Sequence, residues 1–266
     1  MTVIDVRHPS RRLQRDAGAL LRTLARLTVV EARLMLREAA APLFTVLLPI
    51  VLLVAFGLPA STRRPDPVLG GHRSIDTLIP SMSIMVAMAM VAFFMLPVVL
   101  TTYREKGVLR RLSTTPVRPA ALLGAQLVMN AGVVLFATLL TMLIGVAALD
   151  MRMPDPLLVL PTLALGILGL FSLGLVIAAL AATAKAATGY ALAVWFPSAF
   201  FAGLWVPVEY LPAALRRIGD FTPLGAFRQA IQAAWSGEPP HALHLLVLAA
   251  TFVAASTLAV RTFRTT

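Results

Sequence analysis

The sequence predicts an all-α integral membrane protein with six transmembrane helices, an N-terminal amphipathic helix and a re-entrant helical hairpin before the last span. Two observations lead to this fold class. Hydrophobic residues make up 59% of the 266 residues and charged residues only 13%, whereas soluble domains average about 45–50% apolar and about 25% charged. The apolar residues also cluster in runs long enough to cross a bilayer as helices, which needs about 20 residues each.

Six apolar runs are predicted to span the membrane. Because backbone groups in lipid must bond within their own segment, and because these runs are too long for barrel strands, we expect helices. The spans cover about 39–60, 78–101, 121–149, 157–182, 188–206 and 242–260. They form one membrane domain, 39–260, between an N-terminal segment, 1–38, and a short tail, 261–266.

Lysine and arginine are distributed unevenly between the two sides of this topology. Most lie in 1–38, in the loop 102–120, at Lys185 and in the tail. The positive-inside rule places that side, with both chain termini, in the cytoplasm. This asymmetry accounts for the net charge of +11 without nucleic acid as a partner. Arginine greatly outnumbers lysine, as in high-GC bacterial genomes, so we expect a bacterial cytoplasmic membrane.

The N-terminal segment is predicted to contain an amphipathic elbow helix. Its arginines recur every four or seven residues and share one helix face, with leucines on the opposite face. The elbow residues are Arg22, Arg26, Arg33 and Arg37. Such a helix lies in the headgroup plane, with its basic face toward anionic lipid or a cytoplasmic partner. A simple positively charged anchor is the alternative interpretation.

Segment 203–241 contains two apolar stripes, each too short to cross the membrane. We therefore expect a re-entrant or interfacial hairpin on the outer side, before the last span. Its marker residues are Pro207, Leu211, Pro212 and Pro223. The tryptophan and tyrosine residues of the segment suit the membrane–water boundary.

The middle parts of the predicted spans carry no Asp, Glu, Lys or Arg. Ion-coupled carriers generally need ionisable groups or ion sites at membrane depth, which argues against that class. The sequence has no phosphate-binding loop of the GxxxxGK[ST] type and no HExxH motif. We therefore expect no enzyme activity and no cofactor or metal bound by this chain. If the protein transports, the energy must arrive through contact with another subunit.

The second predicted span is rich in methionine. Flexible thioethers suit surfaces that accept varied apolar ligands, so this span is a candidate wall of a path for a hydrophobic or amphipathic substrate. The candidate path residues are Met82, Met85, Met88, Phe93 and Phe200. Ordinary helix packing or lipid contact explains the same methionines equally well.

The cytoplasmic loop after the second span reads YREKGVLRRLSTTPVRP, beginning at Tyr103. Its first part can form a short helix with Leu109 and Leu112 on an apolar side, which prolines then end. A solvated basic loop is the alternative, since basic loops are usual on this side.

This loop resembles the hallmark loop of the type-2 ATP-binding-cassette transporter permeases, particularly the bacterial drug-resistance group. The shared features are an acidic–basic pair with glycine, a Leu-Arg-Arg-Leu run and then Thr-Pro. The stretch GLWVPVEYLPAALRRIGDFTPLGAFRQAI is similar to the external hairpin of that family. The stretch LMLREAAAPLFTVLLPIVLLVAFG is similar to its elbow helix and first span.

The resemblance implies an exporter made of two permease copies, expected to be identical, and two copies of an ABC ATPase that binds ATP and Mg. The loop would be the coupling helix, with Glu105, Arg110 and Arg111 as polar docking residues and an apolar seat at the two leucines. The coupling residues are Tyr103, Arg104, Glu105, Lys106, Gly107, Leu109, Arg110, Arg111, Leu112, Thr115 and Pro116. The path would lie between the permeases, along the first, second and fifth spans.

The expected function is the export of a hydrophobic or amphipathic compound, a drug or natural product, from the cytoplasm. Export of a lipid-linked glycan or polysaccharide is an alternative within the same family. An ion-coupled secondary carrier is the alternative from another class.

Overall fold

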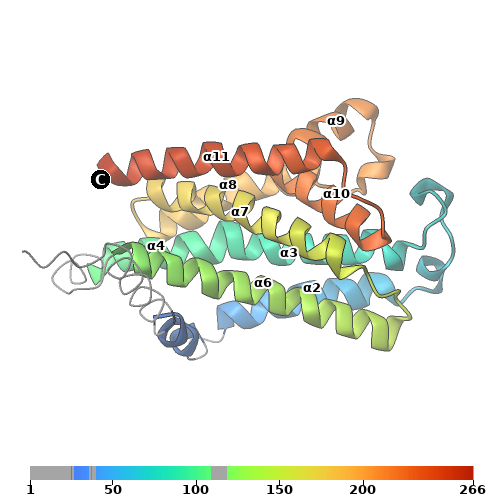
Figure 1. Ribbon diagram of the computed structural model, residues 1–266, viewed down its shortest axis with the longest axis horizontal. Helices are drawn as coiled ribbons and strands as arrows, with labels where there is room; N and C mark the ends of the chain where they lie inside the picture. Colours follow the sequence, from blue (N-terminus) through green and yellow to red (C-terminus); the bar gives the residue numbers. More distant parts are fainter. Residues whose placement is uncertain (1–24, 26, 36, 38–39, 109–118, 266) are drawn as a thin grey trace, which may run out of the picture.

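The computed structural model describes residues 25, 27–35, 37, 40–108 and 119–265. Within them the long helices lie side by side in one bundle (Figure 1). The helices are α2 (Ala40–Gly57), α3 (Leu78–Ala89), α4 (Leu96–Glu105), α6 (Pro119–Leu149), α7 (Pro156–Leu180), α8 (Ala184–Phe201), α9 (Ala213–Phe221), α10 (Pro223–Ser236) and α11 (Ala242–Thr265). A π-helical segment, η4 (Met90–Met95), joins α3 to α4, and short 3-10 turns lie between other helices.

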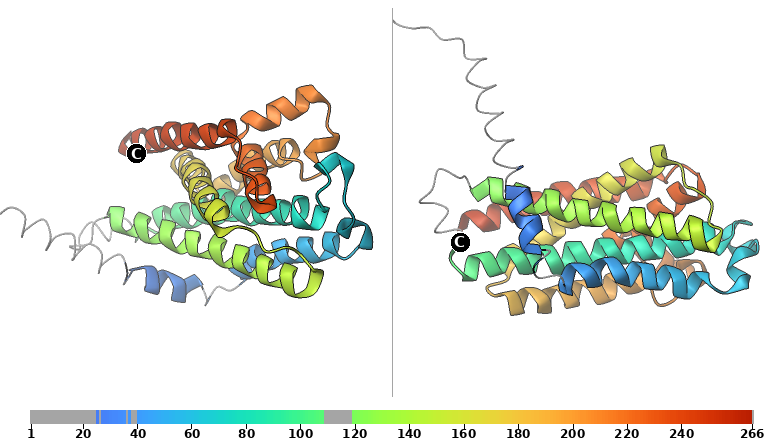
Figure 2. Two further views of the ribbon diagram at one scale, coloured as in Figure 1. Left: turned by 45° about the vertical axis from the view of Figure 1, so that its right-hand side comes forward. Right: turned by 90° about the horizontal axis from the view of Figure 1, so that it is seen from below.

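The bundle has two ends, which both views of Figure 2 also separate. One end carries Tyr103 at the end of α4, the helical residues 27–35 and the C-terminus of α11. We call it the motif end. The other end carries α9 and the 3-10 turns between α2 and α3, and we call it the hairpin end.

Four helices in the described part of the chain are long and apolar enough to cross a membrane. They are Ser74–Glu105, Ala121–Leu149, Pro156–Leu180 and Ala242–Thr262. These four agree closely with the second, third, fourth and sixth predicted spans. The first and fifth predicted spans also fold as helices, α2 and α8, of 18 residues each. At 1.5 Å per residue each is about 27 Å long, slightly less than the usual hydrocarbon thickness of about 30 Å.

The second span contains Pro97, which the sequence predicts to bend the helix. Proline lacks an N–H and its ring crowds the preceding turn. The structure widens the helix just before this residue into the π segment Met90–Met95, and α4 then continues to Glu105. The π segment packs against α7. A Cβ at Gly174 of α7 would collide with the carbonyl oxygen of Ala92 in the π segment. The π-helical turn of the second span and Gly174 of α7 therefore lie at the contact between these two helices.

Helix α7 lies at the centre of the packing. Its small residues allow close approach of two neighbouring helices, as expected for membrane helices. A side chain at Gly166 would collide with the ring of Phe227 on α10, and one at Gly169 would lie 3.0 Å from the carbonyl oxygen of Leu248 on α11. Helix α10 is consequently buried against α3, α7 and α11.

Many large apolar side chains remain exposed on the outside of the bundle. A soluble protein rarely exposes so large an apolar surface, whereas lipid contact makes it favourable. Examples from different helices are Leu43, Phe44, Phe56, Phe136, Leu157, Phe196, Leu246 and Val253.

Candidate functional site

A polar cluster at the motif end joins three segments that are distant in the chain. The Tyr103 hydroxyl on α4 donates a hydrogen bond of 2.6 Å to Oε2 of Glu31, and the Gln126 amide on α6 donates another of 2.6 Å to the same oxygen. Glu31 is only 6% exposed and Gln126 only 1%. A buried carboxylate thus holds the helical residues 27–35 against α4 and α6.

The cluster continues along α6 through a second buried amide. Asn130 lies one turn beyond Gln126, and its Nδ2 donates hydrogen bonds of 2.8 Å to the Gln126 carbonyl and 3.3 Å to Gln126 Oε1. Asn130 Oδ1 has no partner in the described part of the chain. Two adjacent polar turns therefore interrupt an otherwise apolar helix beside the carboxylate.

The two residues after Tyr103 bind the loop between α7 and α8. The Arg104 guanidinium donates a hydrogen bond to the carbonyl oxygen of Ala181, which follows the end of α7. Glu105 Oε1 accepts a hydrogen bond of 3.1 Å from the backbone N–H of Ala184, which begins α8. Helix C-termini favour cations and helix N-termini favour anions, so each side chain complements the helix end that it contacts.

An apolar cavity of about 700 Å³ opens beside this cluster. Its walls come from the helical residues 27–35 and from α2, η4, α4, α6 and α8. Most lining side chains are apolar, and the charged ones are Glu31 and Lys106. The apolar lining residues include Met35, Phe44, Met90, Phe94, Met95, Val98, Val99 and Met129.

An ion-paired clamp closes the hairpin end. Arg73 Nε donates to Asp76 Oδ2 at 2.6 Å, and Arg73 also binds the Asp150 carboxylate at 3.1 Å and the Asp150 carbonyl at 2.7 Å. The backbone N–H of Arg152 donates to Asp76 Oδ1 at 2.7 Å. The hydrogen bond to Asp76 is the main cause that raises the pKa of Arg73, so this guanidinium stays charged and joins the α2–α3 connection to the α6–α7 connection.

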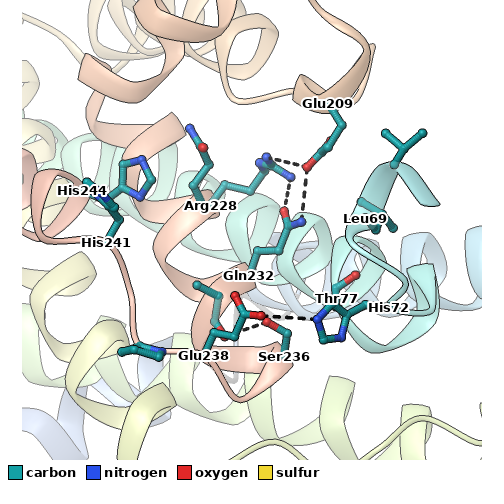
Figure 3. A pocket seen from close by; sticks show the side chains of 14 residues that line it. Leu69, His72, Thr77, Glu209, Arg228, Gln232, Ser236, Glu238, His241 and His244 are labelled. Carbon is teal, nitrogen blue, oxygen red and sulfur yellow. Dashed lines mark hydrogen bonds and ion pairs between the residues drawn. The ribbon is translucent and has the colours of Figure 1, made fainter. Parts of the chain in front are cut away.

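A polar pocket of about 420 Å³ lies at the same end, between α10 and its neighbours (Figure 3). Arg228 of α10 is 1% exposed. Its guanidinium donates to Gln232 Oε1 at 2.6 Å and to Glu209 Oε1 at 3.4 Å, and Gln232 Nε2 donates to the same Glu209 oxygen at 3.2 Å. Two histidine–carboxylate contacts lie nearby, His72–Glu238 at 3.4 Å and His244–Asp220 at 3.5 Å.

The comparison with family models decides what this bundle is. The model of the ABC-2 type transporter matches residues 23–235, which is well over half of the chain. The chain belongs to the ABC-2 type transporter family. A search among curated proteins finds no match. The protein is thus a multi-pass membrane permease of an ABC transporter, and such permeases pair with separate ABC ATPase subunits because their own family domain lacks a nucleotide-binding domain.

Only part of the predicted coupling segment lies among the residues that the structure describes. Tyr103 to Glu105 are the last residues of α4, and Gly107 lies in the turn that follows. Gly107 adopts a left-handed φ of 65°, which favours glycine. The structure gives Tyr103, Arg104 and Glu105 partners within the permease. The other coupling residues, Leu109, Arg110, Arg111, Leu112, Thr115 and Pro116, lie outside the described residues.

Part of the predicted elbow segment lies among the described residues. Residues 27–35 are helical, and Arg33 and Arg37 are exposed. Arg22 and Arg26 lie outside the described residues. The burial of Glu31, which lies on the buried face of this helix, was not predicted from the sequence. Its only local signal was an acidic residue among basic ones.

The predicted path residues do not line the motif-end cavity. Met85, Met88 and Phe93 are at most 1% exposed and lie in the core, where packing explains them. Met82 is half-buried, and Phe200 on α8 is 36% exposed. The cavity wall from the same span consists of Met90, Phe94, Met95, Val98 and Val99.

The predicted hairpin residues begin or bound its short elements. Pro207 precedes the 3-10 turn Val208–Tyr210, Pro212 precedes α9, and Pro223 is the first residue of α10, a position where proline loses no helical hydrogen bond. Leu211 is 8% exposed. Arg228 lies in the same predicted hairpin segment, and its burial is visible only in the structure. No group of three or more potential metal ligands occurs among the described residues.

Proposed function

We propose that this permease is the membrane-spanning half of an ATP-driven exporter that moves a hydrophobic or amphipathic compound, a drug or natural product, out of the bacterial cytoplasm. The observation that carries the proposal is the arrangement of Tyr103, Arg104 and Glu105. These three consecutive side chains contact the helical residues 27–35, the end of α7 and the start of α8. Any displacement of this motif therefore acts on several segments together.

The coupling step starts in the loop that follows the motif. Residues 109–116 dock on the ATPase, with the basic pair Arg110 and Arg111 as polar contacts. Closure of the ATPases on ATP moves this loop, and α4 carries the movement to Arg104 and Glu105. Because these residues bind both ends of the α7–α8 connection, the fifth span moves with the second.

The apolar cavity supports the proposed substrate class. Its wall includes methionine, phenylalanine and valine side chains of η4 and α4, together with Phe44 of α2. Flexible thioethers and aromatic rings accept varied apolar shapes. The second span therefore contributes to the path through Met90, Phe94 and Met95.

The proposed topology has six spans, with α2 and α8 as the first and fifth. Helices of 18 residues can cross when the bilayer thins slightly or flanking residues reach the interface. Helices α9 and α10 form the re-entrant hairpin on the outer side, and both termini are cytoplasmic. Two identical permeases and two ATPases form the complex, with α2, α4 and α8 facing the second copy.

Transport by the reconstituted permease–ATPase complex tests this proposal. We expect ATP-dependent accumulation of a lipophilic dye in proteoliposomes. Charge reversal by Arg110→Glu with Arg111→Glu should abolish accumulation at unchanged permease level. The matched control is Arg216→Glu with Arg217→Glu, which changes the other Leu-Arg-Arg sequence, on α9. Full flux by the permease alone, driven by an ion gradient without nucleotide, would overturn the proposal.

A further inference from the structure

Glu31 is a buried acidic residue that the proposed coupling step does not explain. It is 6% exposed, and both of its hydrogen-bond donors, Tyr103 and Gln126, are neutral groups. Among the described residues no lysine or arginine lies within ion-pair distance of its carboxylate. Buried carboxylates usually have a cationic partner or a metal, since removing the charge from water is costly.

Glu31 also forms part of the wall of the motif-end cavity. Both neutral donors bind Oε2, and no described residue donates a hydrogen bond to Oε1. Among the described lining residues the other charged side chain is Lys106, which is exposed and whose field is therefore screened by solvent. The described cavity lining thus combines an apolar wall with one buried negative group.

We propose that the Glu31 carboxylate binds the positively charged group of a cationic amphiphile whose apolar body lies against Met90, Phe94 and Met95. This inference rests on the proposed function, because it assigns a charge to the substrate of that same path. A cation in the cavity supplies an ion pair that no described residue provides, and the rings of Phe44 and Phe94 in the cavity lining favour a cation through cation–π attraction. An anionic amphiphile would meet repulsion at the same place.

The position of Glu31 also connects substrate binding to the coupling motif. Tyr103 shares the carboxylate oxygen with Gln126, and Arg104 and Glu105 follow it directly. A cation that attracts the carboxylate changes its contact with Tyr103. Bound cation is therefore expected to stimulate ATP hydrolysis by the complex.

The test measures binding of tetraphenylphosphonium, a lipophilic cation, and of neutral triphenylphosphine oxide to the permease–ATPase complex in nanodiscs. Glu31→Gln keeps the size of the side chain and an acceptor oxygen for Tyr103 while it removes the charge. We expect this variant to bind the cation about 10-fold more weakly, as expected for the loss of one nearby opposite charge, with unchanged affinity for the neutral probe. Glu31→Asp should keep the preference for the cation.

The control variant is Glu238→Gln, which removes one negative charge at the hairpin end, where the Glu238 side chain is 65% exposed. It should bind both probes as the unmodified complex does. Equal cation affinity in the unmodified complex and in folded Glu31→Gln would overturn the role of Glu31 and leave the apolar path intact. If Glu31→Gln fails to fold, loss of the preference in Glu31→Asp would also overturn it. Failure of the unmodified complex to bind either probe would count against the path itself.

Discussion

At the motif end, three consecutive side chains contact three different segments, and the donors that the carboxylate of Glu31 receives from described residues are neutral groups. At the hairpin end, the carboxylates of Asp76 and Glu209 are paired with arginines from nearby elements. Removing one partner of a buried, hydrogen-bonded ion pair costs about 3–5 kcal/mol, whereas each motif-end contact is a hydrogen bond between a charged group and a neutral one, which contributes about 1.5–3 kcal/mol. The hairpin end is therefore held rigidly, and the motif end is held by contacts that can exchange during transport.

The largest stability effect should come from Arg228 at the hairpin end. Arg228→Met leaves Glu209 partly buried, with Gln232 as its remaining donor. We expect the free energy of unfolding to fall by about 3 kcal/mol, because breaking a buried pair leaves a charge without its partner. Thermal unfolding of the detergent-solubilised permease measures the change.

The double variant Arg228→Met with Glu209→Gln is the control for this comparison. It removes both charges, so it should recover much of the lost stability, as a double-mutant cycle would show. Equal losses in the single and double variants would mean that the pair does not hold this end.

A smaller loss in the free energy of unfolding is expected at the ion-paired clamp of the hairpin end. Asp76→Asn replaces one carboxylate oxygen by an N–H₂ donor that faces the donor nitrogens of Arg73. We expect a loss of about 2 kcal/mol, because a hydrogen bond to a charged group is broken and a buried donor is left without an acceptor. The measurement is the same unfolding experiment.

Asp66→Asn serves as the matched substitution for Asp76. The Asp66 side chain accepts one hydrogen bond of 2.9 Å, from the N–H of Val68, and an asparagine oxygen can replace it. Its effect should stay below about 0.5 kcal/mol. A similar loss in both variants would contradict the assigned role of the clamp.

The smallest stability effect, combined with a clear functional one, is expected at the motif end. Glu105→Ala removes an exposed contact with the N–H of Ala184, so stability should change by less than about 1 kcal/mol. Transport per ATP hydrolysed should nevertheless fall several-fold, because α8 is no longer held firmly to the coupling motif. Parallel assays of dye uptake and ATP hydrolysis separate the two effects, and an unchanged ratio would show that this contact does not couple.

The helices of this protein were largely predictable, and the contacts of its charged residues were not. The lengths of the apolar runs predicted the four long apolar helices of the described part of the chain. The path residues were placed on Met85 and Met88, which the structure buries in the core. The part of the cavity wall that comes from the same span begins at Met90, in the π-helical segment.

The sequence alone determined the membrane class and the positions of the four long apolar helices of the described part of the chain, because hydrophobic run length is a local property. The tertiary structure alone showed that Glu31 meets Tyr103 and Gln126, and that Arg228 is buried against Glu209. Glu31 lies 72 and 95 residues away from its two donors. The periodicity of a single helix contains no information about such a meeting, since it depends on which helix faces pack together.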